Sequence, residues 1–201
     1  METQKLTYEL SKSEWEMCVD FALFAPNNHS LRAHRGDEIR DKRTLQIQVL
    51  TGKTGEVALN HFLKAYFPNV KVDMEKNKIT DFADFFINEK AIEVKTIKHF
   101  ARYLLIEPKN IHHKLKLAQP LPFLNVLMLN HWNREKDQPS RIVSFEGFVF
   151  DYDLFDERKT SIFKKGEKLP CANQILKQTN FVIHKKDLRK NFSELIHSLT
   201  V

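Results

Sequence analysis

Helical spacing of apolar residues marks several segments of the chain. Val57, Leu59, Phe62 and Phe67 recur near the 3.6-residue period and predict a helix over residues 51–67. Ser13 and Glu16 form an S-x-x-E capping pattern, which predicts a helix from there to about residue 24, stopped by Pro26. Further helices are expected over residues 108–118 and 188–199. The first of these two has a polar side carrying His112, His113, Lys114 and Lys116.

Strand patterns occupy the middle of the chain. Residues 82–87 and 91–97 are rich in aromatic and β-branched side chains and flank a turn at residues 88–90, so they predict a hairpin. Residues 123–129 are almost entirely apolar, as in a strand buried on both faces. Residues 142–152 predict another strand, bent at Gly147, and residues 70–74 a weak one. Residues 45–50 fit either a short strand or the opening of the next helix.

These elements fit one α/β domain over residues 1–201, with a mixed central β-sheet flanked by helices. Within it we expect an N-terminal helix and basic arm over residues 1–50, a core over residues 51–130, and a basic strand and helix region over residues 131–201. A hydrophobic fraction of 42% suffices for a core, and five glycines and seven prolines argue against low complexity.

Charge separates one region from the rest. The chain has a net charge of +6 and a pI near 9.2. Residues 157–190 contain ten Lys or Arg and three acids, a net +7 that exceeds the charge of the whole chain. The remainder is therefore close to neutral, and the basic region favours a polyanionic partner such as nucleic acid.

Targeting and redox signals are sparse. No stretch reaches the roughly 18–20 apolar residues that span a bilayer, and the polar N-terminus resembles neither a signal nor a transit peptide. Cys18 and Cys171 are too few for a disulfide framework and show no zinc spacing. We therefore expect two reduced cysteines, a cytoplasmic location and no membrane partner.

The segment from residue 84 to residue 95 carries the chemistry. If the turn centres on Asn88 and Glu89, Asp84 lies opposite Glu93. Glu93 and Lys95 are two apart on a strand and share one face, whereas Val94 points into the sheet. Two carboxylates so close raise each other's proton affinity, and a hard divalent cation such as Mg²⁺ relieves their repulsion.

A lysine beside such a cation can hold or activate a water molecule and offset charge that builds on phosphorus. Asp84, Glu93 and Lys95 therefore suggest phosphodiester hydrolysis. The competing interpretation is a solvated, salt-bridged strand face, which E-x-K on a strand often is.

The segment resembles the motif of the PD-(D/E)XK nuclease superfamily, which has the restriction-endonuclease-like fold. That pattern places an acid at the start of one strand and E-x-K on the next, matched here by Asp84, Glu93 and Lys95. The family often adds a glutamate on the preceding helix in a G-E-x-A-type opening, matched by residues 55–58 with Glu56. The resemblance covers roughly residues 51–129. Ala83 replaces the usual proline, which leaves Asp81 as a competitor for the metal.

The resemblance implies a restriction-endonuclease-like core that cleaves double-stranded DNA with Mg²⁺. Asp84 and Glu93 would bind the metal, with the Val94 carbonyl as a further ligand. Lys95 would position or activate water, and Glu56 would orient the metal's water shell or bind a second ion. A small sequence-specific restriction enzyme, acting as a homodimer, is the expected form. The alternatives are a repair, recombination or structure-selective nuclease, and a non-catalytic nucleic-acid-binding module.

Other side chains give weaker signals. We expect Lys53 to be an exposed residue at a helix start, and His99 is a remote candidate for the scissile region. The polar arm over residues 27–43 fits either a DNA-groove contact or a solvated loop. Phe163, Phe181 and Trp132 are expected in the core, with base stacking as the alternative. The expected DNA contacts are Arg32, Arg35, Arg40, Arg43, Lys164, Lys165, Lys185 and Lys186.

Overall fold

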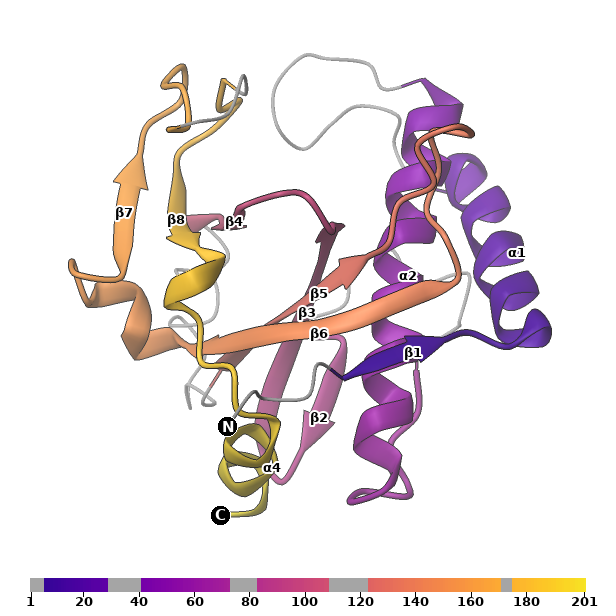
Figure 1. The fold of residues 1–201 in the computed structure, drawn as a ribbon, viewed down its shortest axis with the longest axis horizontal. Helices are drawn as coiled ribbons and strands as arrows, with labels where there is room; N and C mark the ends of the chain where they lie inside the picture. Colours follow the sequence, from indigo (N-terminus) through magenta and orange to yellow (C-terminus); the bar gives the residue numbers. More distant parts are fainter. Residues whose placement is uncertain (1–5, 29–40, 73–82, 109–122, 171–174) are drawn as a thin grey trace.

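A computed structural model describes residues 6–28, 41–72, 83–108, 123–170 and 175–201 of the chain. It is a mixed α/β structure in which a curled five-stranded sheet runs through the centre (Figure 1). The expected fold class is therefore confirmed at the level of a mixed sheet with flanking helices. None of the helices within the described ranges is long and apolar enough to cross a membrane.

The central sheet has the strand order β1-β6-β5-β3-β2. Its strands are β1 (Thr7–Glu9), β2 (Phe85–Ile87), β3 (Lys90–Lys98), β5 (Phe123–Asn130) and β6 (Ile142–Phe150). Only the β3–β5 pair is parallel, and the other neighbours are antiparallel. The apolar run at residues 123–129 thus forms the expected buried strand, β5, with β3 on one side and β6 on the other.

Helices cover one face of this sheet. The side chains of Ile92 and Val94 on β3 pack in one apolar core with residues of α1 (Lys12–Asn28), α2 (Lys42–Lys64) and α4 (Phe192–Thr200). Figure 1 shows α1 and α2 side by side on one flank of the sheet. α2 is thereby fixed against β3, which matters for the site described below.

A second, three-stranded sheet covers the other face, with the order β4-β8-β7. Its strands are β4 (Tyr103–Ile106), β7 (Thr160–Phe163) and β8 (Asn180–His184). Ile97 of β3 and Leu127 and Leu129 of β5 pack there in a separate apolar core. The short 3₁₀ helices η1 (Asp151–Phe155) and η2 (Lys185–Asp187) lie next to these strands in sequence. The sequence patterns did not predict β1 or this second sheet.

The N-terminal helix begins earlier and ends later than expected. The capping box is formed by Ser11 and Glu14, because the Glu14 N–H donates to Ser11 Oγ and the Ser11 N–H donates to the Glu14 carboxylate. Ser13 and Glu16, predicted in those roles, lie inside α1. Pro26 does not stop the helix, which runs to Asn28, since a proline near a helix end removes only one backbone donor.

Other boundaries also shift. Residues 45–50 are helical, because Asp41 caps α2 by accepting from the Thr44 N–H and starts the helix ahead of them. α2 therefore crosses the expected division between residues 50 and 51. The C-terminal helix starts at Phe192 with Asn191 as its cap, four residues later than expected. Val70 and Val72 are not in a strand, and the expected helix over residues 108–118 lies almost wholly outside the described residues.

The bend predicted at Gly147 is present. The pairing of β5 with β6 shifts there, so that Leu127 pairs with Gly147 and Met128 pairs with Phe145. Glu146 is the extra residue of a β-bulge. Gly147 has a φ of 151°, and a Cβ at this position would lie 2.5 Å from the Arg189 carbonyl oxygen. Only glycine fits this bend without a shift of the neighbouring chain.

Candidate active site

The β2–β3 hairpin sets the geometry of the site. Asn88 and Glu89 form its turn with φ values of 46° and 62°, and Ile87 pairs with Lys90. The Asp84 N–H donates to the Ile92 carbonyl at 2.9 Å, which continues the ladder by one residue. Asp84 therefore lies opposite Glu93, as the sequence predicted.

Side-chain contacts then gather the charged groups. Lys95 Nζ forms an ion pair with Glu93 Oε1, and both side chains retain partial exposure. Asp84 Oδ2 accepts a hydrogen bond from the Val94 N–H at 2.6 Å. Val94 itself is buried on the helix-covered face, as expected from its alternate position. The two carboxylates and the lysine thus share one small region of the hairpin.

Helix α2 contributes Glu56 through a close approach to β3. At Gly55 an added Cβ would lie 1.8 Å from Thr96 Oγ1, so only glycine lets the helix approach this near. Glu56 follows directly and is buried. It acts electrostatically on Asp84, whose pKa it helps to raise. The structure therefore brings Glu56 toward the hairpin carboxylates.

Lys53 is not the exposed helix-start residue that the sequence suggested. Because α2 begins at Lys42, Lys53 lies in the middle of the helix and is buried. Its ammonium lies 2.6 Å from Glu56 Oε2 and 4.6 Å from the centre of the Phe21 ring. The expected helix began at residue 51, whereas α2 begins at Lys42, eleven residues before Lys53. This wrong boundary is the reason that Lys53 was expected to be exposed.

Asp84 carries a strong electrostatic perturbation. Burial, followed by repulsion from Glu56 and from Glu93, raises the pKa of its carboxyl from 3.8 to about 8. The Val94 N–H and Lys95 act in the opposite direction and only partly compensate. The cluster contains three carboxylates and two ammonium groups, so it favours one more positive charge near Asp84.

A divalent cation fits this donor set. Mg²⁺ commonly binds through one or two carboxylates, with water and phosphate oxygens completing its shell. Asp84 and Glu93 supply such carboxylates, and the excess of acids at Asp84 is what a cation would relieve. Within the residues the structure describes, no group of three or more His, Cys, Asp or Glu side chains lies close enough together to hold a metal ion.

Asn125 is a neighbour of the site that the sequence analysis overlooked. It pairs with Glu93 across the parallel β3–β5 ladder, so the two side chains project from the same face. The residue is 1% exposed, and neither Nδ2 nor Oδ1 has a hydrogen-bond partner among the residues that the structure describes. The available signal was the presence of one amide within the apolar run over residues 123–129.

The predicted DNA contacts are scattered. Arg32, Arg35 and Arg40 lie outside the described residues, whereas Arg43 is exposed on the first turn of α2. Lys164 and Lys165 follow β7 at the end where Phe163 pairs with Asn180. Lys185 and Lys186 follow β8 at its opposite end. The two lysine pairs therefore do not form one compact patch.

Acidic neighbours also reduce the basic character of residues 157–190. Arg158 pairs with Asp156, and Lys159 and Arg189 both pair with Asp153. Asp153 and Asp156 precede residues 157–190, so the charge count of that segment did not include them. Burial and packing account for the remaining candidates: Trp132 and Phe181 are buried, and Phe163 packs against a small apolar cluster, as expected.

His99 has a structural environment. Its Nδ1 accepts a hydrogen bond from the Trp132 N–H at 3.1 Å, and its ring stacks on His131 with 5.5 Å between centroids. The Lys185 ammonium donates to the His99 carbonyl at 3.2 Å. These contacts hold His99 at the end of β3. His112, His113 and Asp81 lie outside the described residues.

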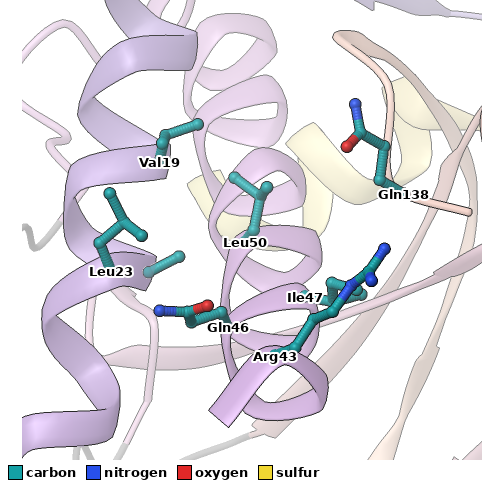
Figure 2. A pocket seen from close by; sticks show the side chains of 8 residues that line it. Val19, Leu23, Arg43, Gln46, Ile47, Leu50 and Gln138 are labelled. Atoms are coloured by element: carbon teal, nitrogen blue, oxygen red, sulfur yellow. The ribbon is translucent and has the colours of Figure 1, made fainter. Parts of the chain in front are cut away.

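A separate hollow lies between α1 and α2. Figure 2 shows Val19 and Leu23 of α1 facing it, with Arg43 of α2 and Gln138 at its edge. Its volume is about 170 Å³, and its lining is mostly apolar. The lining residues are Val19, Ala22, Leu23, Arg43, Gln46, Ile47, Leu50 and Gln138. None of these described residues carries a carboxylate, so the hollow does not share the chemistry of the hairpin site.

Comparison of the chain with protein-family models, with curated proteins and with solved structures found no match to any of the three.

Proposed function

We propose that the protein is a magnesium-dependent DNA endonuclease with its active site on the β2–β3 hairpin. The observation that carries the proposal is the convergence of Asp84, Glu93 and Lys95, with Glu56 close enough to raise the pKa of Asp84. Strongly perturbed carboxyls near a lysine favour a functional site over a solvated salt bridge, because exposed ion pairs shift pKa values little.

The residues would divide the chemistry in the following way. Asp84 and Glu93 would hold Mg²⁺ together with the Val94 carbonyl, and Glu56 would orient its water shell or hold a second ion. The ion would polarise the phosphodiester and lower the pKa of a bound water molecule. Lys95 would leave Glu93 and place its ammonium on the attacking water or on the phosphate, where negative charge develops.

The fold supports this assignment in a coarser way. E-x-K lies on a strand, β3, that has an antiparallel hairpin partner on one side and a parallel buried strand on the other. A helix with Gly55 and Glu56 packs directly on that strand. On this arrangement, and on the resemblance to the PD-(D/E)XK nucleases, we base the proposal of a restriction-endonuclease-like core.

Double-stranded DNA is the proposed substrate, cleaved at a specific sequence by a homodimer. The support is the net charge of +6 and the lysines at both ends of the three-stranded sheet. Repair or structure-selective cleavage is the alternative for the same site. The two differ in product, because a sequence-specific enzyme yields discrete fragments.

The test is digestion of mixed plasmid and phage DNA with and without Mg²⁺, resolved on a gel. Discrete fragments that require Mg²⁺ support restriction-type cleavage. A smear, or cleavage only at flaps and junctions, supports a repair nuclease instead. Binding of DNA without cleavage under any condition would leave a nucleic-acid-binding module and overturn the proposal.

Variants connect the activity to the hairpin. Asp84→Ala, Glu93→Ala and Lys95→Ala are each expected to abolish cleavage with the circular dichroism spectrum unchanged. Glu146→Ala is a matched acidic control, since Glu146 pairs with Lys190 at the β6 bulge. Full activity in any of the three site variants would remove that residue from the mechanism.

A further inference from the structure

Asn125 has a costly environment for a side-chain amide. It is the third residue of β5 with 1% of its surface exposed, and within the described parts of the chain neither polar atom of its amide has a hydrogen-bond partner. A buried amide without partners loses its hydrogen bonds to water and forms none within the protein to replace them, which costs free energy. Unsatisfied buried groups of this kind cluster at functional sites, where a ligand or a second conformation completes them.

Asn130 on the same strand has the hydrogen bonds that a buried amide normally makes. It is also fully buried, but its Nδ2 lies 3.2 Å from Thr54 Oγ1 and 2.9 Å from the Ser140 carbonyl. Its Oδ1 accepts from the Ser140 N–H at 2.9 Å. Two asparagines on one strand, both buried, thus differ in whether their amides have hydrogen-bond partners.

The position of Asn125 identifies the missing partner. It is in register with Glu93 on the adjacent parallel strand, and neighbouring strands lie about 4.8 Å apart. Glu93 projects from the same face in that direction, and its carboxylate pairs with Lys95 on its own strand. On the other side of β5, Asn125 pairs with Val149, which has no polar side-chain group to offer.

Resting on the proposed function, we propose that Asn125 is a positioning residue that hydrogen-bonds the Glu93 carboxylate when Lys95 moves to the DNA. An ammonium that moves onto the phosphate draws away from Glu93 Oε1, with which Lys95 pairs in this structure. When it leaves, one Glu93 oxygen faces the cation and the other requires a donor. Asn125 Nδ2 supplies that donor, and Glu93 stays oriented through the exchange.

The inference predicts opposite effects at the two asparagines. Asn125→Leu removes two unsatisfied polar atoms and keeps the number and branching of the side-chain heavy atoms, so the Tm without metal is expected to stay the same or rise. Asn130→Leu removes a satisfied network, so its Tm is expected to fall clearly. Differential scanning fluorimetry at neutral pH measures both. A Tm loss in Asn125→Leu as large as that in Asn130→Leu would make Asn125 a structural residue and overturn the inference.

Metal response is the second readout. Addition of Mg²⁺ alone is expected to raise the Tm of the wild-type protein more than that of Asn125→Leu. Cleavage by Asn125→Leu is expected to fall about 10- to 100-fold, the usual effect of losing a group that orients a metal ligand. Asn125→Ser retains a donor and is expected to recover part of both effects.

The outcomes distinguish this inference from the function on which it rests. If the wild-type protein cleaves DNA and Asn125→Leu matches it in rate and in Mg²⁺ response, the role of Asn125 is wrong and the nuclease stands. If the wild-type protein shows neither cleavage nor a Tm response to Mg²⁺, the proposed function fails and this inference fails with it.

Discussion

Replacement of Asp84 by asparagine should stabilise the metal-free protein at alkaline pH. The carboxyl lies beside Glu56 and Glu93, and burial together with their repulsion raises its pKa from 3.8 to about 8. Asn keeps the size of Asp84 and the oxygen that accepts from the Val94 N–H. It removes the negative charge that the folded protein must otherwise hold in this cluster above pH 8.

The sign of the effect follows from proton binding. Because the folded-state pKa is the higher one, the folded protein holds a proton on Asp84 between pH 3.8 and about 8, whereas the unfolded chain has released it. Stability therefore falls as the pH rises through this window, by about 1.4 kcal/mol per pH unit for one fully shifted group. Solvent screening of this half-buried side chain reduces the total to about 2–3 kcal/mol.

Urea unfolding at pH 5 and at pH 8, without divalent cations, measures the effect. Wild-type protein and Asp84→Asn should have similar free energies of unfolding at pH 5, and the variant should be the more stable by about 2–3 kcal/mol at pH 8. Equal pH dependence in the two proteins would show that Asp84 is an ordinary carboxylate. The electrostatic argument for a cation at this position would then be wrong.

Two predictions concern α2. Gly55→Ala should destabilise the fold by about 2–3 kcal/mol, because its Cβ would overlap Thr96 Oγ1, whereas Gly52→Ala, with open space around it, should stabilise the helix by up to about 1 kcal/mol. Urea unfolding measures both, and a stable Gly55→Ala would refute the close approach. Lys53→Met should lower the free energy of unfolding by about 3–5 kcal/mol, because it removes the ammonium that pairs with buried Glu56. An unchanged Tm in Lys53→Met would show that the Lys53–Glu56 pair does not stabilise the fold.

The sequence was sufficient for the hairpin because the hairpin is local. Two apolar runs around Asn88 and Glu89 determine the turn, and the turn alone places Asp84 opposite Glu93. The buried strand β5 and the bend at Gly147 could also be predicted, since each depends on the residue types within its own segment. These predictions required no knowledge of distant pairing.

Long-range contacts were harder to foresee. The three-stranded sheet joins β4 to β8, which lie about 80 residues apart in sequence, and no local pattern encodes such pairing. The neutralisation of Arg189 by Asp153 arises in the same way, from a contact that no window of sequence contains. The position of Asn125 beside Glu93 follows from the β3–β5 register, which the sequence alone did not show.

The central claim is that Lys95 acts in phosphodiester cleavage, and a matched pair of lysines tests it most directly. Lys98 lies on the same strand, paired with Asp137 on the opposite face from Lys95. The measurement is the rate of Mg²⁺-dependent plasmid cleavage by Lys95→Ala and Lys98→Ala. The proposal predicts no detectable cleavage by the first and near-wild-type cleavage by the second. Equal rates in the two variants would contradict it.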